Sequence, residues 1–127
     1  MSRIALVVDD SMLIRHMVCR FLEQRGFSVE SAANGREALD LLAAVKPDLI
    51  VTDLEMPRMS GGELIAELKK DGGTAVIPVV VLAGKKTGVP VAEAKFANYV
   101  IYKDIDIEAQ LQRALAVALR DPEKPTN

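Results

Sequence analysis

The chain has 127 residues, of which half are apolar and 27% are charged. This balance is typical of one globular domain with a substantial core, and it excludes an intrinsically disordered chain. The formal net charge of −2 gives no general attraction for nucleic acid or anionic membranes, and the longest apolar run is too short to span a bilayer. We therefore expect a cytoplasmic protein that binds neither nucleic acid nor membrane by this chain alone.

Short apolar runs alternate with segments of helical periodicity from the start of the chain. Residues 4–8 form a continuous aliphatic run, the pattern of a strand covered on both faces. Ser11 stands at the N-cap position of a helix that we expect to stop at Gly26. Residues 27–32 are predicted as a second strand, and Asn34-Gly35 as the turn that opens the next helix.

The middle of the chain continues the alternation. The second helix carries an apolar stripe of Ala38, Leu41, Leu42 and Val45 and is closed by Lys46-Pro47-Asp48. Residues 49–52 are predicted as the third strand, and 58–62 as a loop. A third helix, with Leu64, Ile65 and Leu68 on its apolar face, is expected to end in a turn at 69–74.

The last third of the chain supplies two more strands. Residues 76–83 are almost all apolar and are predicted as a central fourth strand. A loop is expected at 84–90, a weak helix at 91–96 and the fifth strand at 99–102. The final helix has an apolar face of Ile107, Leu111, Ala114, Leu115, Ala118 and Leu119.

Five apolar strands that alternate with helices predict a parallel α/β sheet with helices on both faces. Right-handed crossovers favour a single flavodoxin-like, doubly wound domain with strand order 2-1-3-4-5. We expect this domain to span residues 1–120, with a polar C-terminal tail or the start of a linker at 121–127.

Charged side chains follow three of the predicted strands. Asp9 and Asp10 come after the first strand, Asp53 after the third and Lys103 after the fifth. In the flavodoxin-like order the first and third strands are neighbours, so their carboxyl ends adjoin at the edge where open α/β sheets bind ligands. Singly, each residue fits a turn, a helix cap or a solvated rim charge. Together, they favour a binding site.

Three carboxylates close together require a counter-charge, and oxygen ligands of this kind suit Mg²⁺. In this hypothesis Asp10 and Asp53 bind the ion directly, Asp9 acts through a water molecule, and the backbone carbonyl of Glu55 supplies a further oxygen. Lys103 is then a point-charge partner for an incoming phosphoryl group, and Asp53 is the natural nucleophile.

At these positions the chain resembles the receiver domains of two-component response regulators, the CheY-like family. The resemblance covers almost the whole sequence and rests on four stretches: Leu6-Val7-Val8-Asp9-Asp10-Ser11, Asp48 to Pro57 with Met59-Ser60-Gly61-Gly62, Ile77 to Leu82, and Lys103. It implies that Asp53 is the phosphoacceptor, that Asp9 and Asp10 bind Mg²⁺, and that Lys103 contacts the phosphate. It also implies that a histidine kinase or a histidine phosphotransfer protein donates the phosphoryl group.

The sequence departs from the family pattern in one region. Ala83 stands where the family has a threonine or serine, and Val100 where it has a switch aromatic. Tyr99 and Tyr102 flank Val100, and we expect both to point to other faces. Lys103 is followed by Asp104 in place of the usual proline. The residues expected to accept the phosphoryl group therefore match the family pattern, whereas the positions expected to report phosphorylation to partners, Ala83 and Val100, do not.

Three functions remain open from the sequence. The leading one is a receiver that is phosphorylated on Asp53 and signals through protein contacts, with its kinase and its downstream partner undetermined. The alternative is a phosphorylation-independent pseudo-receiver that acts as a constitutive binding module. An enzyme, a small phosphohydrolase with Asp53 as nucleophile and Glu55 as acid, is not expected, because the chain offers no evident cap or substrate-pocket segment.

Overall fold

The computed structural model describes residues 3–56, 58–84, 97–104 and 106–119. The predicted loop at 84–90 beyond Gly84, the weak helix at 91–96 and the tail at 121–127 lie outside these residues. The elements are the strands β1 (Arg3–Val8), β2 (Phe27–Ala32), β3 (Leu49–Asp53), β4 (Val79–Ala83) and β5 (Tyr99–Tyr102), and the helices α1 (Met12–Glu23), α2 (Gly35–Leu42), α3 (Gly61–Lys70), α4 (Gly72–Ala75) and α5 (Ile107–Ala118).

The five strands form one sheet in the order β2-β1-β3-β4-β5. Every neighbouring pair is parallel; Val8 lies opposite Thr52 and Asp53 opposite Leu82. The predicted α/β class, strand order and flavodoxin-like topology are therefore confirmed. This order makes β1 and β3 neighbours at the centre, so the residues that follow them meet at the carboxyl-terminal end of the sheet.

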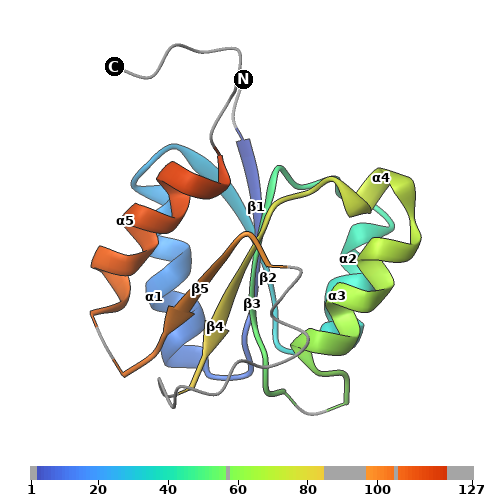
Figure 1. Cartoon of the computed structure of the whole chain (residues 1–127), viewed down its shortest axis with the longest axis horizontal. Coiled ribbons are helices and arrows are strands. Elements are labelled where there is room, and N and C mark those ends of the chain that lie inside the picture. The colour runs from blue at the N-terminus through green and yellow to red at the C-terminus, as the bar shows by residue number, and fades with distance from the viewer. Residues whose placement is uncertain (1–2, 57, 85–96, 105, 120–127) are drawn as a thin grey trace.

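Helices cover both faces of the sheet, with α1 and α5 on one side and α2, α3 and α4 on the other (Figure 1). Alternate residues of each strand serve the two layers, because side chains along a strand point to opposite faces. In β1, Ala5 and Val7 pack under α1 and α5, whereas Leu6 and Val8 pack under α2 and α3. Burial on both faces explains why the central strands are continuous apolar runs.

Side-chain caps define the beginnings of the helices. Ser11 Oγ accepts a hydrogen bond from Ile14 N, as predicted, and Asn34 Oδ1 accepts one from Glu37 N. Ser60 and Glu63 form a complete capping box at the start of α3. This box begins the helix at Gly61, so the predicted loop at 58–62 is two residues too long at its end. The Ser-x-x-Glu signature of such a box was readable in the sequence.

Three other predicted boundaries were wrong. The turn expected at 69–74 is mostly helical, because α3 continues to Lys70 and α4 begins at Gly72. The fourth strand begins at Val79 and not at residue 76, because residues 72–75 form the short helix α4 and Val76 is its exposed C-cap. Pro78 also lacks the N–H that a ladder requires. In addition, α2 ends at Leu42, so Val45 of the predicted stripe follows the helix.

The two tyrosines of β5 lie on different faces. Tyr99 packs with the α1 and α5 layer, whereas Tyr102 packs with the opposite layer, as Val100 does. The prediction that both point away from the face of Val100 is right for Tyr99 and wrong for Tyr102, because residues two apart in a strand share a face.

None of the helices in the described segments has the length and apolarity needed to cross a membrane.

Candidate functional site

Asp9 and Asp10 extend from the end of β1 at the sheet edge. Asp9 is fully buried, and its backbone N donates to Ala32 O over 3.1 Å. Asp9 Oδ1 accepts a hydrogen bond from Ser11 N at 2.8 Å, and its carbonyl accepts one from Arg15 Nη1 at 2.7 Å. Asp9 is therefore held from both its side chain and its backbone, while Asp10 is exposed.

Asp53 is the last residue of β3 and is 5% exposed. The next residue, Leu54, donates its backbone N–H to Leu82 O at 3.1 Å, which ties the strand end to β4. Asp53 Oδ1 accepts from Glu55 N at 3.4 Å. The carboxylate thus stands at the sheet edge on a fixed backbone.

Lys103 reaches this edge from the end of β5. Its backbone N donates to Ala83 O at 2.9 Å, and its side chain is 21% exposed. The ammonium Nζ lies 2.9 Å from Asp53 Oδ2 and 3.0 Å from Asp9 Oδ2. A single cation therefore joins the ends of the first and third strands, as the order of the strands predicted.

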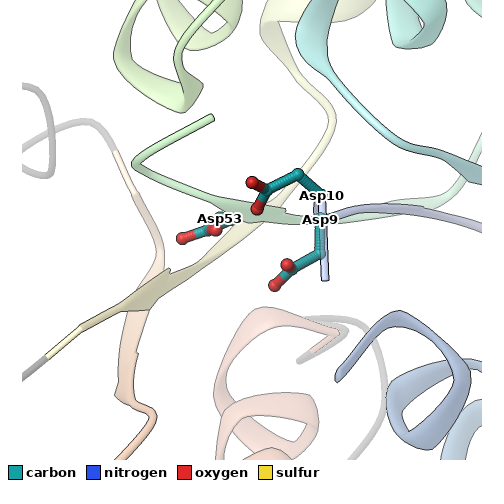
Figure 2. Close-up of side chains that lie close together, drawn as sticks. All are labelled: Asp9, Asp10 and Asp53. Atoms are coloured by element: carbon teal, nitrogen blue, oxygen red, sulfur yellow. The ribbon is translucent and has the colours of Figure 1, made fainter. Parts of the chain in front are cut away.

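The three carboxylates gather at the ends of β1 and β3 (Figure 2). Each of Asp9, Asp10 and Asp53 offers one oxygen, and these oxygens all lie within 4.8 Å of one another. Three negative formal charges and the one positive charge of Lys103 leave two negative charges. The cluster therefore has a net formal charge of the same magnitude as that of one divalent cation and of opposite sign.

Burial and charge shift two pKa values at the site. Burial raises the pKa of the Asp53 carboxyl, the charge of Asp9 acts in the same direction, and Lys103 offsets only part of the rise. For Lys103, burial alone would lower the pKa, but the carboxylates of Asp53 and Asp9 outweigh burial and raise it. The ammonium is therefore held in its charged form between the two acids.

The donor set fits a hard cation such as Mg²⁺. Asp9 Oδ2 is buried, and its partner among the described residues is Lys103 Nζ, 3.0 Å away. Such an oxygen keeps lone pairs available to a ligand, and carboxylate oxygens are what Mg²⁺ prefers. Glu55 lies beside the cluster through its backbone N; the use of its carbonyl as a ligand stays a prediction, as does the water-mediated role of Asp9.

With this geometry established, comparison with known proteins gives the family. The model of the response regulator receiver domain matches residues 5–115. The chain belongs to this family. A response regulator MprA of Mycolicibacterium vanbaalenii is 44% identical over 80 residues, which are 63% of this chain and 34% of that protein. The receiver therefore aligns with about a third of that relative's length.

Solved receiver structures share the fold over nearly the whole chain. The chemotaxis response regulator CheY4 of Vibrio cholerae is 32% identical with a TM-score of 0.82, covering 92% of this chain and 99% of that one. The receiver domain of a histidine kinase from Syntrophus aciditrophicus is 25% identical with a TM-score of 0.80, covering 99% and 97%.

The two atypical positions of this receiver lie together beside the site. Ala83 ends β4, is 8% exposed and stands opposite Tyr102 in the register of β4 and β5. Val100 stands opposite Val81 and packs on the same layer as Ala83. A buried methyl and an aliphatic side chain thus stand where the sequence resemblance leads us to expect a hydroxyl and a ring, and Tyr102 is an aromatic residue of this face.

Two polar residues near the site were missed in the sequence. Arg15 holds the carbonyl of Asp9, and nothing in the spacing of α1 marked it for that contact. Gln110 is 5% exposed and binds the backbone of Tyr102. A signal for Gln110 existed, because a glutamine three residues after Ile107 falls within the apolar stripe of the last helix.

Proposed function

We propose that this receiver accepts a phosphoryl group on Asp53 from the histidine of a histidine kinase or a histidine phosphotransfer protein, with Mg²⁺, and signals through protein contacts. The observation that carries the proposal is the position of Lys103 Nζ, 2.9 Å from Asp53 Oδ2 and 3.0 Å from Asp9 Oδ2. A cation at this distance from the acceptor neutralises charge where the phosphoryl oxygens would arrive.

In the proposed transfer, a carboxylate oxygen of Asp53 attacks phosphorus. The bond from phosphorus to the donor nitrogen breaks, its electron pair stays on that nitrogen, and an acyl phosphate forms on Asp53. The chain's own contribution is positioning and charge neutralisation, as in other phosphoryl transfers. Asp53 is consumed as a stoichiometric acceptor, so we propose no turnover of an external phosphate ester.

For the metal, we propose Asp10 and Asp53 as direct ligands, with Asp9 acting through water and the Glu55 carbonyl as a further oxygen. The support is the unbalanced charge of the cluster and the closeness of one oxygen from each of the three carboxylates, all within 4.8 Å of one another. When bound, Mg²⁺ would supply positive charge that offsets the repulsion between the carboxylates and a phosphoryl group.

The alternative of a phosphorylation-independent binding module is not favoured. A constitutive module has no need of a buried acid pair joined to a lysine from another strand, and burying such charges costs free energy unless they are paired. What the atypical Ala83 and Val100 alter is the way in which an acyl phosphate on Asp53 would be sensed.

The proposal is tested by treating the purified chain with acetyl phosphate and measuring its intact mass, in Mg²⁺ and in EDTA. We expect one phosphoryl adduct in Mg²⁺, a large reduction in EDTA and no adduct on the Asp53→Asn variant. The absence of an adduct on the wild-type chain, under conditions that label an ordinary receiver, would overturn the proposal.

A further inference from the structure

Among the strands that the structure describes, the strand that carries Lys103 lies at the outer side of the sheet, next to β4 alone. β5 has four residues and is the last strand in the order β2-β1-β3-β4-β5. An edge strand has hydrogen-bonding groups on one side with no neighbouring strand to pair them. Because Lys103 follows β5 directly, looseness at this end of the strand would move the ammonium away from both acids.

The side chain of Gln110 pairs with that outer side at Tyr102. Gln110 Oε1 accepts a hydrogen bond from Tyr102 N at 3.0 Å, and Gln110 Nε2 donates to Tyr102 O at 2.8 Å. One primary amide thus satisfies both backbone groups of one residue, as a neighbouring strand would. The second N–H of Nε2 donates to Asp106 O at 3.3 Å, which joins this contact to the N-cap residue of α5.

The residue that makes this contact, Gln110, is buried, whereas Tyr102 is partly buried. Gln110 is 5% exposed and lies among the buried residues Ile107, Leu111 and Ala114 of α5. A buried amide group is costly unless its hydrogen bonds are made. In the described part of the chain, all the hydrogen bonds of this amide serve the end of β5 and the start of α5.

The end of β5 is therefore held on two sides at consecutive residues. Tyr102 is bound by Gln110 on the outer side, and Lys103 N donates to Ala83 O at 2.9 Å on the β4 side. From this fixed point the Lys103 side chain reaches Asp53 and Asp9. We propose that Gln110 is a positioning residue for Lys103, which acts by clamping Tyr102 and so sets the ammonium between the two carboxylates.

The clamp can be tested without phosphorylation, through the reactivity of the Lys103 amine. Each variant is acetylated briefly with N-hydroxysuccinimide acetate, and the labelled lysines are quantified by peptide mass spectrometry with exposed Lys46 as internal standard. Gln110→Leu is compared with Gln112→Leu, the same change at an exposed position of α5. We expect Lys103 labelling to rise roughly threefold to tenfold in Gln110→Leu alone, which corresponds to about 0.7–1.4 kcal/mol.

Gln110→Glu covers the case in which Gln110→Leu does not fold, because it keeps the acceptor for Tyr102 N and loses the donor. In Gln110→Glu we expect the labelling of Lys103 to lie between that of the folded wild type and that of the wild type unfolded in urea. Equal Lys103 labelling in the wild type, the folded Gln110 variants and Gln112→Leu would overturn the proposal.

A second readout separates positioning from general stability, and it rests on the proposed phosphorylation of Asp53. Gln110→Leu should lower the rate of phosphorylation by acetyl phosphate roughly tenfold, and it should have no further effect in a Lys103→Met chain. Equal effects in both backgrounds would show that Gln110 does not act through Lys103. If no chain is phosphorylated, the proposed function fails, while the labelling result still decides the role of Gln110.

Discussion

Asp53 carries two roles at the scale of a single residue, as the proposed acceptor and as a buried charge. Burial makes this carboxyl harder to ionise, and Lys103 compensates only in part. A buried carboxyl whose pKa is shifted by burial and by specific charge partners is a candidate for a functional residue.

The raised pKa of Asp53 predicts how stability depends on pH in metal-free buffer. The folded state holds its proton to higher pH than the unfolded state, so the free energy of unfolding falls as pH rises from about 3.8 through the folded pKa. Asp53→Asn cannot titrate and should lack this fall. Lys103 acts in a separate window, since its raised pKa adds stability that is lost only at alkaline pH.

The measurement is urea unfolding of both chains in EDTA between pH 4 and pH 7, values chosen to bracket the carboxyl range. If the wild type and Asp53→Asn have the same slope of unfolding free energy against pH, burial does not raise the pKa of Asp53.

Asp10 is the exposed member of the acid cluster, and it is one of the two proposed direct metal ligands. When free Mg²⁺ is about a hundred times its dissociation constant, binding to the folded state alone adds about 2.7 kcal/mol to the free energy of unfolding. We expect this gain in the wild type and its loss in Asp10→Asn. The matched control is Glu30→Gln, the same change at an exposed acid on β2. Stabilisation of Asp10→Asn by Mg²⁺ to the wild-type extent would remove Asp10 from the site.

At the scale of elements, the end of β3 depends on the first residue of α3. Gly61 N donates to Leu54 O at 2.9 Å, and a Cβ at Gly61 would overlap the carbonyl oxygen of Asp53 and lie 2.8 Å from Leu54 Cα. The backbone that carries Asp53 therefore packs directly against a glycine, and only a residue without a side chain allows this approach.

Gly61→Ala should lower the free energy of unfolding by about 1–3 kcal/mol or more, because backbone must move to admit the methyl group. It should also slow phosphorylation of Asp53. Gly72→Ala is the control, since nothing lies within 4 Å of a Cβ at Gly72, and we expect a change of about 0.5 kcal/mol or less. Equal stability of the two variants, measured by urea unfolding, would contradict this account.

The elements also show where sequence reasoning succeeds. Apolar runs predicted four of the five strands, and residues 27–32 were predicted as the short second strand although Ser28, Glu30 and Ser31 are polar. With the crossover rule, these strands predicted which strand ends meet, so Asp9, Asp53 and Lys103 were brought together correctly. Boundaries were harder where a local contact competes with the apolar pattern. Asp71 caps α4 by accepting a hydrogen bond from Gly73 N. The apolar run predicted as the fourth strand from residue 76 therefore begins with the C-cap of a helix.

Contacts between a side chain and a backbone group far away in the sequence could not be predicted from the sequence. The pairing of Gln110 with Tyr102 depends on how α5 lies against the edge strand, which periodicity does not specify. The same holds for Arg15 and the Asp9 carbonyl.

At the scale of the whole molecule, the question is how phosphorylation would alter the α2–α4 face of the sheet. Ala83, Val100 and Tyr102 share this layer, and Ala83 brings no hydroxyl to the position where the sequence resemblance leads us to expect threonine or serine. A lost hydrogen bond to a charged acceptor is worth about 1.5–3 kcal/mol. The bias toward an active state should be weakened by this amount while phosphoryl transfer itself persists.

Ala83→Thr should restore part of that bias. We expect larger phosphorylation-linked shifts of backbone amide signals in nuclear magnetic resonance spectra of Ala83→Thr than of the wild type, at equal degrees of phosphorylation. Ala83→Val, which adds bulk of similar shape without a hydroxyl, is the matched control. If threonine and valine give the same shifts as alanine, the missing hydroxyl does not limit the response.

The central claim is that Asp53, and no other acid of the cluster, accepts the phosphoryl group. Borohydride reduces an aspartyl phosphate to homoserine, so treatment of the acetyl phosphate-labelled chain followed by peptide mass spectrometry identifies the acceptor directly. The account predicts homoserine at position 53, in much higher yield with Mg²⁺ than in EDTA, with Asp9 and Asp10 unchanged. Homoserine at position 9 or 10, or none at position 53 in a chain that carries the phosphoryl adduct, would contradict it.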